Sequence, residues 1–308
     1  MMMRTKNGRI DLQAFLKNKY INKWWLFSLV AIPMSAIIAV ELMRTGLSVG
    51  EDISHMIGYS VRFAVPFIFL VVAASAVQTL FPGPIPMWSL RNRKYIGFCF
   101  VVAMAWQGSF IFIMSNFFRD YYYADIYLLR DELEGSIGYI FIPAMVVTSF
   151  HFGRKYLTQK QWSLLHTSGI YFLFAYPFSV YWWNTAHYYG EPDTIDYVFY
   201  WMGFLAFAAR IAAWGKRRLK AAAKDLSAGS PPFLLRIIGG IVIGLGLYAA
   251  ATGAQWQKAT SEFLLTPQWA ADLELWFPYW PFEPFLPLLV IGLGTWLLTT
   301  VSRVRAAG

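Results

Sequence analysis

Two histidines flank a short basic segment in the middle of the chain. His151 follows one apolar run and His166 begins the next, with Arg154, Lys155 and Lys160 between them. Imidazole ligates metal ions, including haem iron, and exchanges protons near neutral pH. Two imidazoles at one membrane surface therefore form a candidate redox site. The alternative is that both are helix-end residues that hydrogen-bond to carbonyls, lipid phosphate or the adjoining loop, since a cation also suits the C-terminal end of a helix.

Other polar residues in or near apolar runs are further candidates. Arg62 lies inside an apolar run, where it either reaches toward Asp52 or a lipid head group or faces a cavity that binds a haem propionate, a quinone or a lipid phosphate. Cys99 is the only cysteine, and it is either a thiolate ligand or a buried packing thiol. His55 and His187 lie near acidic residues, where an outer metal or quinone site competes with a solvated polar rim. Zinc would need a third ligand at a defined spacing, and the sequence offers none.

The elements that must position these residues are membrane helices. Hydrophobic residues make up 57% of the chain and charged residues 14%, and the mean hydropathy is +0.45. A bilayer core about 30 Å thick requires about 20 apolar residues per helix. The sequence therefore predicts an all-α integral membrane protein of about eight transmembrane helices, the short fourth run being expected to extend into its flanks. The apolar runs cover residues 25–42, 56–81, 95–117, 137–150, 164–183, 197–214, 233–253 and 285–301.

The distribution of charge predicts the orientation of these helices. Lys and Arg concentrate on the cytoplasmic side of a membrane. The N-terminal segment, the loops around Arg91 and Arg154 and the segment 215–232 are basic, whereas acidic residues gather in the alternate loops. Both termini are therefore expected in the cytoplasm. These basic segments form a cytoplasmic collar, a ring of positive charge at the anionic inner leaflet. The net charge of +9 is attributed to this collar and not to nucleic-acid binding.

Composition divides the chain into a cytoplasmic segment (1–24), a six-helix core (25–214), a basic linker (215–232) and a two-helix extension (233–308). Within the extension, Gly240 and Gly244 form a small-xxx-small face, with Gly239 and Gly246 beside them, suited to packing within the chain or against another subunit. The loop "TPQWAADLELWFPYWPFEPFLP" is rich in proline and aromatic residues. It is either an aromatic belt at the membrane interface or a docking surface for another membrane subunit.

Three segments in helices three to five resemble the ferric reductase-like transmembrane superfamily. They are "LRNRKYIGFCF" (90–100), "GYIFIPAMVVTSF" (138–150) and "WSLLHTSGIYFLF" (162–174). Members of this superfamily include the haem subunit of the periplasmic methionine-sulfoxide reductase and the membrane half of NADPH oxidases. The resemblance implies a six-helix bundle that holds b haem between histidine ligands and passes electrons across the membrane.

The resemblance also implies roles for particular residues. His166 stands at the family's first ligand position on helix five, and the second position on that helix falls near Ser179. Gln107 stands where helix three is expected to carry a ligand histidine. The implied function is a transmembrane electron-transfer component, linked to b haem or a quinone. Because no stretch is long enough for a flavin domain, a separate flavin reductase would supply the electrons.

Two alternative functions follow from the same residues. The missing histidine of helix three, the two-helix extension and the aromatic loop fit a haem-free accessory or structural subunit of a larger membrane complex. A small-molecule transporter has support only from the number of helices. The short loops and the family variant favour the bacterial inner membrane.

Overall fold

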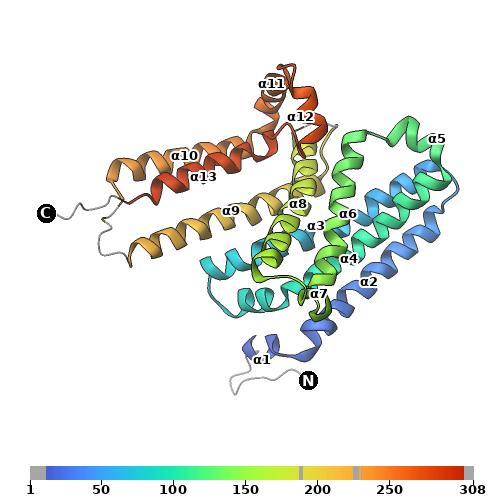
Figure 1. Cartoon of the computed structure of the whole chain (residues 1–308), viewed down its shortest axis with the longest axis horizontal. Coiled ribbons are helices and arrows are strands. Elements are labelled where there is room, and N and C mark those ends of the chain that lie inside the picture. Colours follow the sequence, from blue (N-terminus) through green and yellow to red (C-terminus); the bar gives the residue numbers. More distant parts are fainter. Residues whose placement is uncertain (1–11, 187–189, 225–228, 230, 302–308) are drawn as a thin grey trace. The chain divides into compact units, whose positions relative to one another are not determined.

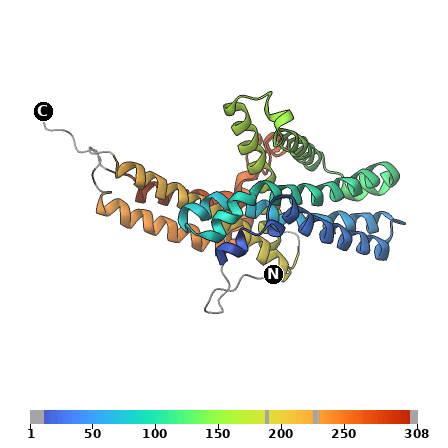
Figure 2. The same ribbon diagram turned by 90° about the horizontal axis from the view of Figure 1, so that it is seen from below.

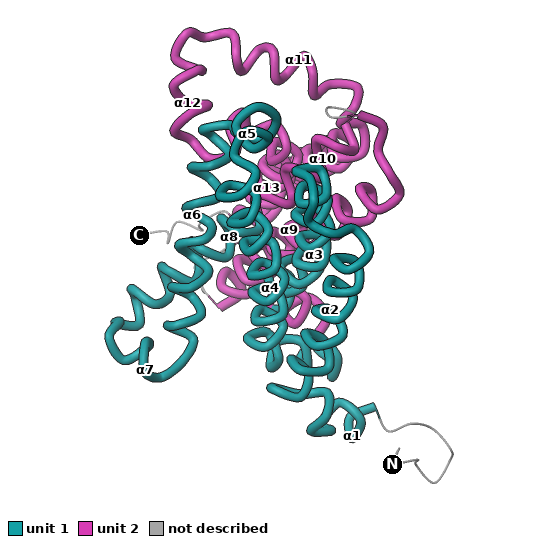
Figure 3. The backbone as a smooth tube through the Cα atoms, turned by 90° about the vertical axis from the view of Figure 1, so that its right-hand side faces the viewer, with its two compact units in different colours: residues 1–74, 82–174 teal, residues 75–81, 175–308 magenta. Residues whose placement is uncertain are grey.

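The computed structural model consists of helices joined by short connections (Figure 1). It describes residues 12–186, 190–224, 229 and 231–301. Every regular element in those residues is helical, which confirms the predicted all-α class. The chain divides into two compact units, coloured separately in Figure 3: unit 1 comprises residues 1–74 and 82–174, and unit 2 comprises residues 75–81 and 175–308. The predicted core at 25–214 divides the chain at other places and stays a prediction.

Unit 1 contains the first part of the chain up to the middle of α8. Its short elements are α1 (Leu12–Leu16), η1 (Lys19–Ile21), α5 (Arg119–Tyr121), η2 (Tyr122–Ile126) and α7 (His151–Arg154). Its long helices are α2 (Lys23–Thr45), most of α3 (Gly50–Leu80), α4 (Pro84–Phe117), α6 (Leu129–Thr148) and the first half of α8 (Gln159–Thr185).

Unit 2 contains the remainder of α3 and α8. Its further elements are α9 (Thr194–Ala222), α10 (Phe233–Ala251), α11 (Gly253–Leu265), α12 (Ala270–Trp276), η3 (Glu283–Phe285) and α13 (Leu286–Leu298). The helix α9 begins with a reciprocal capping box between Asp193 and Asp196. It continues through the basic residues to Ala222, so the first part of the predicted linker is helical.

Each predicted apolar run lies mainly within one helix. The short fourth run extends, as expected, toward the N-terminus, since α6 begins at Leu129 with acidic residues in its first turn, where they suit the positive end of a helix. Five helices of the described residues are long and apolar enough to cross a membrane: α2, α3, α4, α9 and α10. Membrane-spanning helices are thus compatible with the structure, while the number eight and the orientation of the termini stay predictions.

In unit 1, α2 packs against α4 (Figures 1 and 2) and a buried polar network fixes its start. The amide of Asn92, which is fully buried, donates to Oδ1 of Asn22 at 2.9 Å and accepts from the backbone N–H of Lys23 at 2.9 Å. The guanidinium of Arg91 donates to the same Oδ1 at 2.8 Å. A basic residue assigned to the cytoplasmic collar therefore also holds the entry to the first long helix.

In unit 2, α10 packs along α13 through glycines that differ from those predicted. A Cβ added to Gly239 would lie 2.7 Å from the carbonyl oxygen of Gly294, and one added to Gly246 would lie 2.9 Å from that of Pro287. Nothing lies within 4 Å of a Cβ at Gly240 or Gly244. The face of α10 that packs within the chain therefore carries Gly239 and Gly246. The predicted packing of the Gly240 and Gly244 face within the chain is wrong, because neighbouring residues point about 100° apart around a helix. A contact of that face with another subunit stays a prediction.

Candidate functional site

The imidazole of His166 lies in the second turn of α8 and is held by residues of unit 1. Its Nε2 atom lies 3.0 Å from Oγ1 of Thr148, at the end of α6. Its ring stacks on that of Trp162 with 4.4 Å between centroids. The indole of Trp162 in turn donates to the backbone carbonyl of Thr148 at 3.1 Å. These three residues fasten the start of α8 to the end of α6.

The other hydrogen bond of the Thr148 hydroxyl bears on which atom donates in its contact with His166. The hydroxyl lies 2.7 Å from the carbonyl oxygen of Ala144, where it donates its single proton. With that proton donated to Ala144, the contact with His166 places a proton on Nε2, which donates to the hydroxyl oxygen. Nε2 then has no lone pair to offer an iron atom. In this arrangement His166 is a structural hydrogen-bond donor through Nε2.

The loop that joins α6 and α8 places cations beside these rings. The guanidinium of Arg154 lies over the ring of Trp162, 5.4 Å from its centroid. The ammonium of Lys94 donates to the carbonyl of Ser149 at 2.6 Å and lies 4.5 Å from the ring centroid of Phe150. Arg154 of the basic segment thus lies on an aromatic face of α8, and Lys94 of α4 is bound to a carbonyl and an aromatic face at the end of α6.

Gln107 is buried on α4 and bonded to a neighbouring helix. Its Oε1 atom accepts a hydrogen bond from the hydroxyl of Tyr139 on α6 at 3.1 Å, and the same hydroxyl lies 3.2 Å from the carbonyl of Met104. A Cβ at Gly108 would lie 3.0 Å from the Tyr139 ring, so glycine allows the two helices to approach. This amide at the expected ligand position joins α4 to α6.

The remaining candidates, His151 and Arg62, lie apart from these contacts. His151 is exposed and is the first residue of α7, beyond the end of α6, so it does not occupy the last turn of a long helix. Arg62 is exposed on α3. Within the part of the chain that the structure describes, no hydrogen bond or ion pair joins any two of His166, His151, Gln107 and Arg62.

These residues do not fit a haem held as the family resemblance implies. The α6 partners of His166 and Gln107 are Thr148 and Tyr139, nine residues apart and therefore separated by about 13 Å along one helix. Two axial ligands must face each other across one iron atom. The described residues also contain no group of three or more His, Cys, Asp or Glu side chains that could hold a metal ion. Cys99, the remaining candidate thiolate, is buried.

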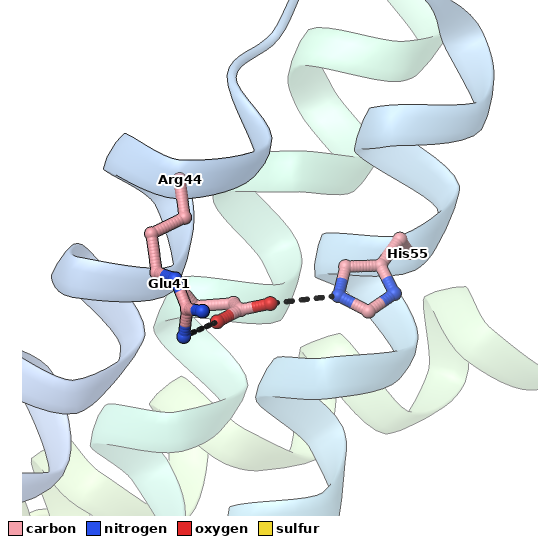
Figure 4. A network of polar contacts seen from close by, with 3 residues as sticks. All are labelled: Glu41, Arg44 and His55. Atoms are coloured by element: carbon pink, nitrogen blue, oxygen red, sulfur yellow. Dashed lines mark hydrogen bonds and ion pairs between the residues drawn. The ribbon is translucent and has the colours of Figure 1, made fainter.

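The second histidine pair is only partly described. Nε2 of His55 on α3 lies 3.3 Å from a carboxylate oxygen of Glu41 on α2, whose other oxygen lies 3.7 Å from Arg44 (Figure 4). His55 and Arg44 are largely exposed. His187 lies outside the described residues. The contacts of His55 are those of a solvated polar rim.

One group of buried polar residues in unit 2 escaped the sequence analysis. Glu283 is fully buried although it lies in the aromatic loop, and its Oε1 atom accepts from the indole N–H of Trp183 at 3.4 Å. Gln257 and Ser261 on α11 are also buried. A signal was present, since Glu283 is the one acid of residues 276–287, where the prolines and aromatic residues are densest, but it was counted among the acids of the outer loops.

Comparison with known proteins adds no relative. No protein-family model, curated protein or solved structure matches this chain.

Proposed function

We propose that this chain is a haem-free accessory or structural subunit of a larger complex in the bacterial inner membrane. The observation that carries this proposal is the hydrogen bond from Nε2 of His166 to Thr148. It gives the one histidine at a family ligand position a structural role within the protein. A family resemblance without the family's ligand residues supports assembly better than redox chemistry, because function depends on the site and not on the fold.

The surfaces of the long helices support the placement of this chain in a membrane. Large apolar side chains are exposed on α2 and α10, including Leu29, Ile32, Ile241 and Leu245. Such surface is costly in water and suits the hydrocarbon of a lipid bilayer. With the basic loops, this surface supports an orientation in which both termini lie in the cytoplasm.

Assembly with partner subunits draws on the loop that precedes α13. The side chains of Trp269, Trp276 and Phe277 are each more than half exposed, whereas Tyr279 and Trp280 in the same loop are buried. The buried rings fix the loop, and the exposed rings present aromatic surface of the kind enriched at protein interfaces. We propose that these three side chains meet a neighbouring membrane subunit.

An absorption spectrum tests this proposal against electron transfer through b haem. The purified protein, expressed with haem supplied, is measured oxidised and after reduction with dithionite. We expect protein absorbance alone, in wild type and His166→Ala alike. A Soret band that changes on reduction and is lost in His166→Ala would overturn the proposal and establish the electron-transfer function instead.

Extraction in mild detergent tests the second part of the proposal. We expect the tagged chain to migrate with partner subunits, and Trp276→Ser with Phe277→Ser to release them while the chain itself stays folded. A matched control changes Phe263→Ser, an exposed ring on α11 outside this loop. Recovery of the wild-type chain only as a monomer would contradict an accessory role.

A further inference from the structure

Glu283 is a buried acid that forms no ion pair within the described part of the chain. Its side chain has no exposed surface, and its Oε2 atom has no hydrogen-bond partner among the described residues. Its other oxygen accepts from the indole of Trp183 at 3.4 Å, and the hydroxyl of Ser261 also bonds to this carboxylate. No Lys or Arg of the described chain forms an ion pair with it. An isolated buried carboxylate costs many kcal/mol, so it must acquire a compensating positive charge.

The buried face of α11 places a second oxygen near this carboxylate. That face consists of Gly253, Gln257 and Ser261, spaced four residues apart and therefore in line along the helix. Gly253 lies against the ring of Trp182, and Ser261 bonds to Glu283. Gln257 lies between them, and its Oε1 atom is also buried, with no hydrogen-bond partner in the residues that the structure describes.

The two oxygens, Oε2 of Glu283 on η3 and Oε1 of Gln257 on α11, lie on two elements that pack against each other. Carboxylate, amide and hydroxyl oxygens are the ligands that hard cations prefer, and the same pair of oxygens can share a proton. The buried indole N–H of Trp182, close to Gly253, likewise has no acceptor among the residues described. A water that accompanies a cation would accept this bond, as buried waters commonly do.

We propose that unit 2 encloses a site for one small monovalent cation, a sodium ion or a proton, bound between the carboxylate of Glu283 and the side-chain oxygen of Gln257. Ser261 supplies a further oxygen, and Trp183 fixes the carboxylate. The site lies between α11, η3 and the end of α8, and it is independent of whether the chain binds haem.

Other titratable groups on the elements around Glu283 could also respond to pH, and the acidic and basic ones mostly face solvent. Lys258 and Glu262 on α11 and Asp272 on α12 are exposed, Glu274 on α12 is half-buried, and α13 carries no titratable side chain. The tyrosines on the neighbouring segments are Tyr181, Tyr200 and Tyr279, which are buried. A cation response that disappears with Glu283 is therefore distinguishable from general surface titration.

Thermal unfolding of the full chain in detergent tests the site. The midpoint is compared in NaCl, KCl and choline chloride at equal ionic strength, and then over about pH 5 to pH 8 at fixed salt. The test variant is Glu283→Gln, which keeps the shape and removes the charge. The control is Glu262→Gln, an exposed acid on α11. Gln257→Ala removes the second oxygen, and it replaces Glu283→Gln as the test variant if Glu283→Gln does not fold.

Each result has a defined meaning. Bound sodium is expected to raise the wild-type midpoint by about 5 °C in NaCl relative to choline chloride, with no rise in Glu283→Gln. Bound proton is expected to give a wild-type midpoint that falls with rising pH regardless of the salt, and a flat profile in Glu283→Gln. The Glu262→Gln control should follow wild type. Identical cation and pH responses in wild type and Glu283→Gln, or in Gln257→Ala where that variant replaces it, would overturn the proposal.

Discussion

The Nε2 atom of His166 lies 3.0 Å from the hydroxyl oxygen of Thr148, and that hydroxyl donates a hydrogen bond to the carbonyl oxygen of Ala144. The histidine therefore joins the start of α8 to the end of α6. Replacing Thr148 by Val leaves the shape of the side chain and removes the acceptor. We expect a loss of about 1 kcal/mol of unfolding free energy, since the partly buried N–H of His166 loses its partner. Unfolding by denaturant measures this loss. Thr167→Val, at an exposed position on α8, is the control, and an equal loss there would contradict the assignment.

The hydrogen bond between Tyr139 and Gln107 predicts a coupling between two helices. Tyr139→Phe and Gln107→Leu each break the 3.1 Å bond, so the second change should cost less once the first has been made. We expect a coupling free energy of about 1 kcal/mol from the double-mutant cycle. Strictly additive losses would show that the two side chains contribute independently.

The glycines of α10 offer a matched pair of variants. Gly239→Ala places a methyl group 2.7 Å from a backbone oxygen of α13, where a neighbouring helix must shift, and should cost roughly 1 to 3 kcal/mol. Gly240→Ala meets nothing within 4 Å and should be neutral or stabilise the helix by up to about 1 kcal/mol. Unfolding in a denaturing detergent compares the two. The reverse order would contradict the observed face of α10.

The carboxyl group of Glu283 predicts a pH dependence of stability. Burial raises the pKa of Glu283 from 4.5 to about 7. Because the folded pKa is the higher one, the folded protein holds the proton more tightly than the unfolded chain does. The resulting stabilisation, roughly 3 kcal/mol, is complete below about pH 4.5 and is lost as the pH rises through 7. Unfolding free energies measured across this range in choline chloride, without sodium, should decline in wild type, and a decline of equal size in Glu283→Gln would refute the assignment.

The predicted orientation can be measured by cysteine labelling, because the native Cys99 is buried. Ala259→Cys lies on an exposed face of α11, in a predicted outer region, and Gln161→Cys is exposed at the start of α8, in a predicted cytoplasmic region. A membrane-impermeant maleimide should label the first variant in intact cells and the second only after lysis. Wild type should stay unlabelled. The opposite pattern would place both termini outside.

The long helices could be predicted from the sequence because the thickness of a bilayer sets the length and the apolar composition of a membrane helix. Both can be read from the residue types. It was less informative about helix ends. The helix α4 begins at Pro84 and not near Tyr95, since proline suits the first turn and the basic residues that follow are good helix formers. The helices α11 and α12 were not predicted, because their polar sequences carry no membrane signal.

Site residues were harder to predict than helices. The residue types at 107 and 166 could be read directly, but their partners Tyr139 and Thr148 depend on how α6 packs against α4 and α8. The burial of Glu283 depends on contacts with Trp183 and Ser261, which are distant in sequence. A sequence pattern reports which groups are present, whereas their hydrogen bonds depend on tertiary packing.

The close approach of Gly239 to Gly294 also has a consequence for biosynthesis. The two residues are 55 positions apart, so α10 leaves the ribosome well before its partner helix exists. At about 5 to 20 residues per second, α10 waits roughly 3 to 11 s with this glycine face lacking its partner helix. Insertion and pairing of this hairpin are therefore separate events in time, and the interval between them is when a competing helix could occupy the face.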